Sequence, residues 1–330
     1  MKRFLISLIP HRGIRRSLLR QLENGYPDTL PKLPEMPAVN FFENDFPNYL
    51  SIVLIIKNES HLMPEWLEYH IMMGVDKFYI YDNESTDNLK DVLTPYIRDG
   101  IVEYFLWPDD PEKIVKDNFR TTPQVLAYND AVNRFRDRTK WMAFIDADEF
   151  ITPIKHANLK DFLHDFDKIG VAEIVLFWKN YCSSGHLLEP DGLMCENFRF
   201  AEYGIPEVKS IVNPRATISA NMHTHAVTGP AVMEDLFLYR NDGKRNLGPW
   251  KANIACISHY YTRSVQGYMN KKKRGDMLDK ITDESFLGAA RFHQYDSKAI
   301  TYDDTMVKHA PAIRQAIKAR AESHTLSKPK

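Results

Sequence analysis

The sequence predicts an α/β fold in which helices cover both faces of a mostly parallel sheet. Strand-like and helix-like segments alternate along residues 51–145, which is the pattern of repeated βαβ units. The 330-residue chain is 44% hydrophobic and 12% aromatic, which supplies enough apolar surface for a large core. We therefore expect one globular α/β domain.

The first repeat of this pattern lies at residues 51–81. Residues 51–56 form a continuous apolar, β-branched run, typical of a strand buried on both faces. Residues 61–73 carry apolar side chains at helical spacing, and Gly74 then ends the helix. Residues 77–81 have the composition of a second strand. These segments predict a βαβ unit.

The alternation continues towards residue 178 and then weakens. Helical spacing or an extended apolar composition marks six more segments. Helices are expected at 87–98, 123–136 and 158–166, and strands at 101–107, 141–145 and 171–178. Residues 180–260 mix short extended pieces with Gly, Pro and His, and the residues after 264 favour helices.

The two ends of the chain are expected to lie outside the α/β domain. Residues 1–48 form a basic, proline-rich lead-in, residues 49–275 the domain, and residues 276–330 a helical C-terminal extension with a polar tail. No stretch reaches the roughly 20 apolar residues of a membrane span. Basic residues alternate with Leu and Ile near the N-terminus, which fits either a frayed chain end or a peripheral contact with an anionic membrane.

Charge and cysteine content narrow the class of protein. The formal net charge is -1, from 43 basic and 44 acidic residues, so no excess positive field favours nucleic acid. The cysteines, Cys182, Cys195 and Cys256, form no C-x-x-C pair, which disfavours a zinc or redox site. A reducing compartment fits best, and we expect a cytoplasmic protein at the inner face of a membrane.

The sharpest motif is WMAFIDADEF, residues 141–150. An apolar strand runs directly into Asp146 and Asp148, and ligands of open parallel sheets bind outside the carboxyl ends of the strands. Two carboxylates separated by one small residue suit Mg²⁺ or Mn²⁺, which then bridges a diphosphate. A D-x-D pattern alone also fits a solvated acidic turn, so the strand before it carries the interpretation.

Polar side chains also follow the first two predicted strands. Such groups at the carboxyl edge of a sheet can hydrogen-bond a base and a ribose, although turn and helix-capping chemistry gives the same composition. The candidate nucleotide-binding residues are Lys57, Asn58, Glu59, Asp82 and Asn83.

A series of motifs runs along roughly residues 50–275. They are KNE (57–59), EWLEYHIMMGVDKFYIYDNESTD (65–87), QVLAYND (124–130), WMAFIDADEF, FWKNYCSSGHLLEPDGL (177–193), VKSIVNP (208–214), ISHYYTRS (257–264) and KKKRG (271–275). Together these motifs resemble glycosyltransferase family 92 and its relatives among the glycosyltransferase-2-like GT-A enzymes. They occur in family order, which makes the match more specific than any one motif.

The resemblance implies a Rossmann-like GT-A fold and a nucleotide-sugar donor, usually linked to UDP. It also implies a Mn²⁺ or Mg²⁺ ion held by Asp146 and Asp148, and inverting transfer of a hexose to a glycan or glycolipid acceptor in polysaccharide or glycoconjugate synthesis. Tyr181 and Cys182 stand where the family usually has Phe-Gly, which leaves the acceptor preference open.

Residues after the sheet complete the predicted site. Enzymes of this type often add a histidine to the metal, and His223, His225 and His259 are candidates. His223 or His225 is preferred, because a His-x-His pair on an extended segment puts both rings on one side. The remaining candidates are Arg263, Lys272 and Arg274 for the diphosphate, and Gln124, Asn129, Trp178, Ser184, Gly185 and His186 for substrate.

Inversion requires a general base that takes the proton of the attacking hydroxyl. Asp191, Glu196 and Glu207 are the candidates, and the sequence does not choose among them. Two other functions are compatible with the same residues: a metal-dependent nucleotidyltransferase or phosphohydrolase, and an inactive sugar- or nucleotide-binding protein. No G-x-x-x-x-G-K-[ST] or G-x-G-x-x-G motif occurs, which disfavours phosphate-loop ATPases and dinucleotide-dependent oxidoreductases.

Overall fold

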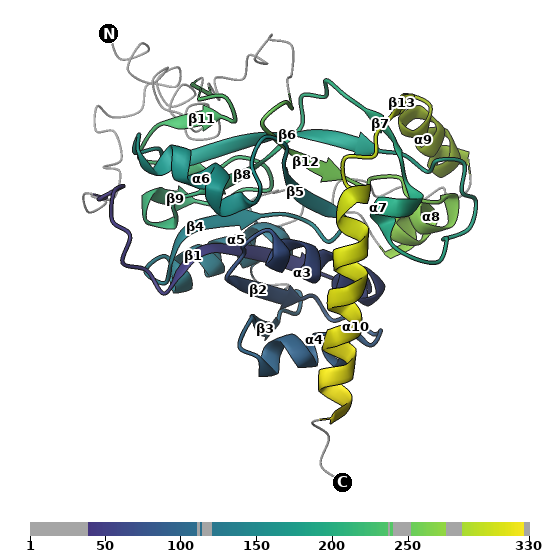
Figure 1. Cartoon of the computed structure of the whole chain (residues 1–330), viewed down its shortest axis with the longest axis horizontal. Coiled ribbons are helices and arrows are strands. Elements are labelled where there is room, and N and C mark those ends of the chain that lie inside the picture. Colours follow the sequence, from purple (N-terminus) through teal and green to yellow (C-terminus); the bar gives the residue numbers. More distant parts are fainter. Residues whose placement is uncertain are drawn as a thin grey trace.

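The main sheet is parallel in its N-terminal half and mixed in its C-terminal half. The computed structural model describes residues 39–110, 113, 121–236, 238–239, 252–274 and 286–326. The strand order is β13-β7-β6-β8-β4-β1-β2-β3, and Figure 1 shows the N-terminal strands at one end of the sheet and the C-terminal strands at the other.

The N-terminal half of the sheet is parallel, as predicted. Its four strands pair in parallel in the order β3-β2-β1-β4. They are β1 (Asn48–Ile56), β2 (Lys77–Asp82), β3 (Val102–Leu106) and β4 (Thr139–Phe144). Because they run the same way, their carboxyl ends meet at one edge of the sheet, where ligands of such folds bind.

Helices cover both faces of this half, which confirms the α/β prediction. Within β1, Ile52 and Leu54 pack with Trp66 on one face, while Val53 packs with Tyr128 on the other. Burying one such side chain contributes about 1.5–3 kcal/mol. The first face is covered by α3 (Met63–Met72), α4 (Leu89–Arg98) and α6 (Leu159–Asp167), and the second by α5 (Pro123–Phe135).

The C-terminal half of the sheet is mixed, which the sequence did not predict. Strand β8 runs antiparallel to both β4 and β6, while β12 pairs in parallel with β6 and antiparallel with β5. The bounds are β5 (Glu149–Pro153), β6 (Glu173–Tyr181), β7 (Phe200–Glu202), β8 (Val208–Val212), β11 (Ala231–Met233), β12 (Ala255–His259) and β13 (Thr301–Tyr302). A separate ribbon joins β9 (Thr217–Ser219) to β10 (Ala226–Val227).

The described C-terminal residues pack onto the domain instead of extending from it. Asp303 forms a 2.8 Å ion pair with Lys179 of β6, and each side chain is only 2% exposed. Figure 1 shows α10 crossing α3, where Arg320 pairs with Glu68 at 3.0 Å. The late helices are α7 (Met194–Asn197), α8 (Val265–Arg274), α9 (Phe286–Asp296) and α10 (Ala310–Leu326). The described residues beyond the predicted boundary at residue 276 are therefore packed against the same domain.

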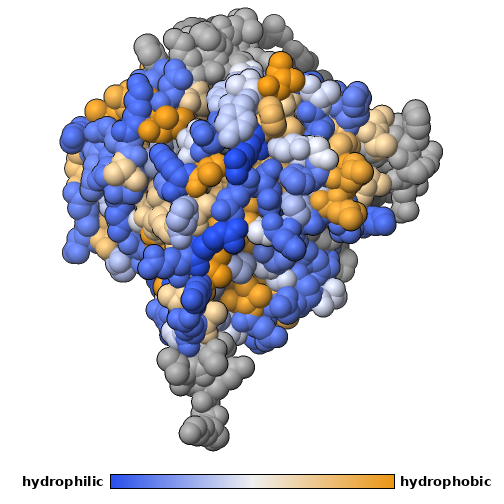
Figure 2. Space-filling view, turned by 45° about the vertical axis from the view of Figure 1, so that its right-hand side comes forward, coloured by the Kyte–Doolittle hydropathy of each residue, from blue (hydrophilic) through white to orange (hydrophobic). Residues whose placement is uncertain are grey.

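The surface seen in Figure 2 is dominated by hydrophilic residues, with described apolar side chains in small separate groups. None of the helices in the described ranges combines the length and apolar character needed to cross a bilayer. The predicted basic lead-in lies outside the described residues as far as residue 38.

Candidate active site

The Asp146-Ala147-Asp148 triplet lies in the turn between β4, which ends at Phe144, and β5, which begins at Glu149. The prediction that these acids follow a buried strand is confirmed. Their environments differ, because the side chain of Asp146 is 38% exposed and that of Asp148 only 3%. Asp148 is therefore the better shielded of the two carboxylates.

Each carboxylate is paired with a lysine from a distant segment. Lys209 Nζ of β8 lies 3.0 Å from Asp146 Oδ2 and 3.4 Å from Glu149 Oε2. Lys271 Nζ of α8 lies 2.5 Å from Asp148 Oδ2. Burial alone would raise the pKa of Asp148, but Lys271 and His259 hold it well below its usual range. Both aspartates therefore stay ionised and able to bind a cation.

Gln124 belongs to the same cluster. Its Nε2 donates 2.9 Å hydrogen bonds to Asp146 Oδ1 and to the hydroxyl of Tyr128. The sequence suggested Gln124 as a substrate ligand, whereas in the structure its amide fixes the orientation of Asp146. Thr122 and Pro123 start α5 at this point, with Thr122 Oγ1 accepting from Val125 N at 3.3 Å.

Of the three candidate histidines, His259 is the one with a close approach to Asp148. The pairing of β12 with β5 places it opposite Glu149, and its Nε2 is 3.6 Å from Asp148 Oδ1. Its Nδ1 is buried without a hydrogen-bond partner among the described residues. The ring is 4.3 Å from that of Trp178, measured between centroids. Trp178 thus packs beside the candidate metal ligands.

The preference for His223 or His225 assumed an extended segment, but residues 222–224 form a bend. His223 Nδ1 bonds to the carbonyl of Val208 at 3.0 Å. His225 is buried against Phe144, and this burial lowers its pKa to about 3. Its Nδ1 accepts from the main-chain N of Asn221 at 3.0 Å, which ties the ring to its own loop.

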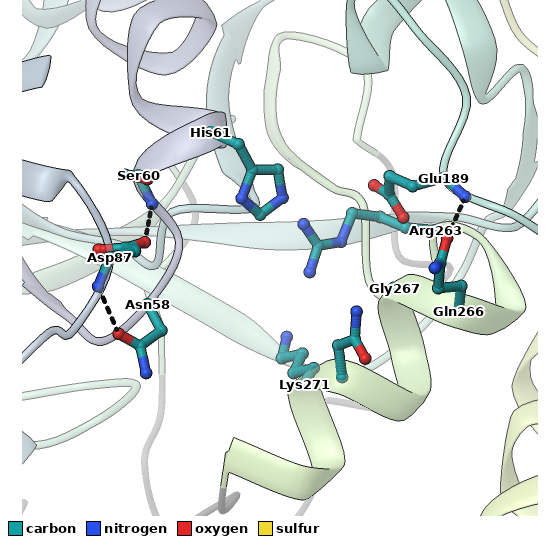
Figure 3. A pocket seen from close by; sticks show the side chains of 10 residues that line it. Asn58, Ser60, His61, Asp87, Glu189, Arg263, Gln266, Gly267 and Lys271 are labelled. Atoms are coloured by element: carbon teal, nitrogen blue, oxygen red, sulfur yellow. Dashed lines mark hydrogen bonds between the residues drawn. The ribbon is translucent and has the colours of Figure 1, made fainter.

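A pocket of about 440 Å³ opens beside this cluster. Figure 3 shows His61, Arg263 and Lys271 pointing into the space between α8 and the loops that follow β1 and β2. Lys271 joins the two features, because it lines the pocket and also pairs with Asp148. The lining residues are Asn58, Ser60, His61, Asp87, Glu189, Arg263, Gln266, Gly267, Asn270 and Lys271.

Arg263 is the most unusual residue of the pocket. Its side chain is 3% exposed and forms a 3.2 Å ion pair with Glu59 through Nη2. Its Nε and Nη1 are buried and lack hydrogen-bond partners among the described residues. Its backbone φ of 47° lies in the left-handed region, which costs a non-glycine residue about 1–3 kcal/mol and is typical of functional sites. A buried guanidinium with unused donors is suited to an anion.

The strand-end candidates divide into one pocket residue and several that stabilise loops. Asn58 lines the pocket and its Oδ1 accepts from Thr86 N at 2.6 Å. Asp82 stabilises the local structure, because it accepts from Ser85 N at 2.8 Å and from the Tyr104 hydroxyl at 2.5 Å. The Asn83 amide donates to Trp107 O and Asp109. Glu59 forms an ion pair with Arg263. Neither Lys57 nor Glu59 lines the pocket.

Lys272 and Asn129, two further phosphate and substrate candidates, do not line the pocket. Lys272 Nζ is 5.4 Å from the centroid of the Tyr268 ring, and the side chain of Arg274 lies outside the described residues. The amide of Asn129 is engaged within the protein, because it bonds to Val125 O and to both main-chain groups of Ala220.

The Ser-Ser-Gly-His segment forms a tight loop with two residues in the left-handed region. The φ of Ser184 is 52° and that of Gly185 is 85°. Ser184 Oγ accepts from Arg199 N at 2.9 Å, and the His186 carbonyl accepts from Val265 N at 3.2 Å. These hydrogen bonds connect the loop to Arg199 and to the start of α8.

None of the three predicted general bases lines the pocket. Asp191 and Glu207 are exposed, and Glu196 forms an ion pair with Arg314 of α10. The pocket instead contains Glu189, which sequence reasoning missed although it lies two residues before Asp191. The available signal was its place in the segment that follows Ser-Ser-Gly-His.

No three His, Cys, Asp or Glu side chains in the described ranges gather closely enough to form a complete metal site by themselves. Asp148 and His259 provide two adjacent donors. Mg²⁺ and Mn²⁺ sites in nucleotide-dependent enzymes commonly combine one or two carboxylates with phosphate oxygens of the substrate. The donor set therefore fits a cation that the substrate helps to bind.

Comparison with known proteins points to one family. The model described as Glycosyltransferase family 92 matches residues 55–262. A glycosyltransferase family 92 protein of Ricinus communis is 27% identical over 228 residues, covering 65% of this chain and 35% of the relative. A galactan beta-1,4-galactosyltransferase of Arabidopsis thaliana is 27% identical over 127 residues, covering 37% of this chain and 24% of that protein.

The similarity to solved structures is weaker. A crystal structure of S. aureus TarS in complex with UDP has a TM-score of 0.33 and 15% identity, and the match covers 50% of this chain and 47% of that one. This chain spans only about a third of the length of the family 92 relatives from Oryza sativa and Ricinus communis.

Proposed function

Since the chain belongs to glycosyltransferase family 92, we propose that it transfers a hexose from a nucleotide sugar to a glycan acceptor, with a divalent metal ion. The observation that carries the proposal is the position of Lys271, which lines the pocket beside Arg263 and reaches Asp148. One ligand in the pocket can therefore contact both cations and a metal held by the aspartate.

The donor diphosphate is the group that fits these charges. Arg263 provides two buried donor atoms, Nε and Nη1, that have no hydrogen-bond partner in the described part of the chain. Lys271 provides an ammonium group at the other side of the pocket. Guanidinium and ammonium groups bind phosphate oxygens through charge-assisted hydrogen bonds. Asn58 lines the pocket and comes two residues after the end of β1, and we assign the nucleoside to that side.

The metal ion, Mn²⁺ or Mg²⁺, is assigned to Asp148 and His259, with Asp146 beside it. When bound, it offsets negative charge that develops on the departing diphosphate. Lys209 and Gln124 hold Asp146 in place, and the burial of Asp148 strengthens its attraction for a cation by excluding water.

We propose that transfer inverts the anomeric carbon in a single displacement. The acceptor hydroxyl attacks that carbon, the bond to the diphosphate oxygen breaks, and the bonding pair leaves with the diphosphate. Arg263 and Lys271 stabilise the leaving group, since their charges are already in place before the reaction. The acceptor enters from the side of the Ser-Ser-Gly-His loop.

A UDP-linked donor and a role in surface polysaccharide or glycoconjugate synthesis are the most specific parts of the proposal. They are supported by the family and by the galactan galactosyltransferase among its relatives. We also propose a cytoplasmic location at the inner face of a membrane, supported by the basic residues among the first 20. Cell fractionation with and without 1 M salt tests this, because a peripheral electrostatic contact dissociates in salt.

The donor is tested by a thermal-shift and hydrolysis panel of UDP-, GDP-, CMP- and dTDP-sugars, each with Mn²⁺ and with chelator. We expect one nucleotide to stabilise the protein only with metal and to be released slowly from its sugar. Release of phosphate or pyrophosphate would favour a phosphohydrolase. Metal-independent binding without turnover would favour an inactive binding protein.

A further inference from the structure

We propose that Glu189 is the general base that deprotonates the acceptor hydroxyl, an inference that rests on the proposed glycosyltransferase function. Within the described ranges, the pocket is lined by two carboxylates, Glu189 and Asp87. Both oxygens of Asp87 are engaged locally, Oδ2 by Ser60 N at 2.9 Å and Oδ1 by Leu89 N at 3.2 Å. Asp87 therefore stabilises the loop before α4. Glu189 is the carboxylate that keeps one oxygen without a hydrogen bond among the described residues.

The structure holds the Glu189 carboxylate firmly. Oε2 accepts a 2.5 Å hydrogen bond from Ser264 Oγ, and the main-chain N of Glu189 donates to Gln266 Oε1 at 3.0 Å. Among the described residues no hydrogen bond engages Oε1. A base needs such an arrangement, with one oxygen fixing the side chain and the other available to a hydroxyl.

The start of α8 is shaped around this carboxylate. A Cβ atom at Gly267 would collide with Glu189 Oε2, so a larger residue there would displace the end of the Glu189 side chain from its present position. Ser264 Oγ also accepts from Gly267 N at 2.9 Å and thereby caps α8. The same helix supplies Lys271, and Arg263 lies immediately before Ser264. Base, leaving-group cations and helix cap are thus parts of one local structure.

Figure 3 shows Glu189 on the Arg263 side of the pocket, facing the space into which His61, Arg263 and Lys271 point. Glu189 follows Leu187 and Leu188, which are 72% and 71% exposed. Glu189 therefore comes directly after two exposed residues and lies in the pocket beside Arg263.

The chemical step balances without another reactant. The acceptor oxygen forms its bond to the anomeric carbon while the bond from that carbon to the diphosphate breaks. The diphosphate leaves with the bonding electron pair, and the hydroxyl proton moves to Oε1 of Glu189. The protonated carboxyl then releases this proton to solvent.

The experiment uses the full chain with UDP-galactose and UDP-glucose in Mn²⁺. It follows release of UDP, with water and then p-nitrophenyl β-galactoside as acceptor. In Glu189→Gln we expect kcat to fall about 10²–10⁴-fold, the range for loss of a general base, while the Kd for UDP stays within about twofold.

Two further variants keep the inference open to refutation if Glu189→Gln folds poorly. Ser264→Ala removes the hydrogen bond that holds the Glu189 carboxylate, so kcat should fall while the Kd for UDP stays within about twofold. The exposed Glu322→Gln on α10 is the matched control and should behave like wild type.

The outcomes separate the two proposals. If wild type binds no nucleotide sugar, the proposed function fails first. If wild type releases UDP and Glu189→Gln does so at the same rate, only the assignment of the base is overturned. A loss of kcat in Asp191→Asn, Glu196→Gln or Glu207→Gln, with Glu189→Gln unaffected, overturns it equally.

Discussion

Lys209 Nζ lies 3.0 Å from Asp146 Oδ2 in a setting where only 2% of the lysine side chain is exposed. Burial lowers the pKa of Lys209, but Asp146 and Glu149 outweigh it and raise the pKa above the ordinary lysine value. The lysine is therefore a permanent positive charge between two carboxylates, and removing it leaves them uncompensated.

Lys209→Met should reduce the free energy of unfolding by about 3–5 kcal/mol, the cost of breaking a buried ion pair from one side. Urea unfolding at pH 7 measures this. Lys160→Met is the matched control, because Lys160 pairs with Asp76 at 2.6 Å but is 38% exposed. It should lose less than about 1 kcal/mol. Equal losses in the two variants would contradict the argument from burial.

Asp148→Ala should lower the turnover rate by orders of magnitude, since it removes the shielded candidate metal ligand. The stabilisation of the protein by Mn²⁺ together with UDP should disappear in the same variant. Asp165→Ala, at a 52% exposed side chain on α6, serves as the control. A folded Asp148→Ala enzyme with near-wild-type turnover in Mn²⁺ would refute the metal assignment.

Arg263→Met should weaken UDP binding about 10–100-fold, because a charge-assisted hydrogen bond contributes about 1.5–3 kcal/mol. Isothermal titration with UDP and Mn²⁺ measures the change. Arg134→Met, at a 45% exposed arginine on α5, should bind UDP as wild type does. If the two variants bound UDP equally well, the anion site would have to lie elsewhere.

The free energy of unfolding should depend on pH through His70. Its Nδ1 bonds to Trp66 O at 2.8 Å and its Nε2 accepts from Ile151 N at 3.2 Å. Burial lowers the pKa of His70 from 6.5 to about 3, so between these pH values the unfolded chain binds a proton that the folded chain does not. Stability is therefore lost as pH falls below about 6.5.

The comparison variant is His70→Leu, which should be less stable than wild type at pH 8 because Ile151 N and Trp66 O lose their partner. Its stability should nevertheless decline less between pH 7 and pH 5. His164→Gln, at a 58% exposed ring, should keep the wild-type dependence. Parallel stability curves for wild type and His70→Leu would exclude His70 as the source.

The sequence by itself determined the parallel half of the fold and the position of the acids. The strands at 51–56, 77–81, 101–107 and 141–145 were predicted to within a few residues. Buried parallel strands are continuous apolar runs, and the polar residues that end them are visible in the chain. Asp146 and Asp148 could be placed at a strand end for this reason.

The tertiary structure alone decided which residues join those acids. Strands β5 and β12 are short and pair across about 100 residues, so no local pattern announces that His259 faces Glu149. Lys209 is one lysine among many until β8 inserts antiparallel beside β4. The Glu189 carboxylate is held by the hydroxyl of Ser264, 75 residues further along the chain, and lies where a Cβ atom of residue 267 would otherwise be. Periodicity records which face a residue occupies, whereas these partners are fixed by long-range packing, which the local sequence does not encode.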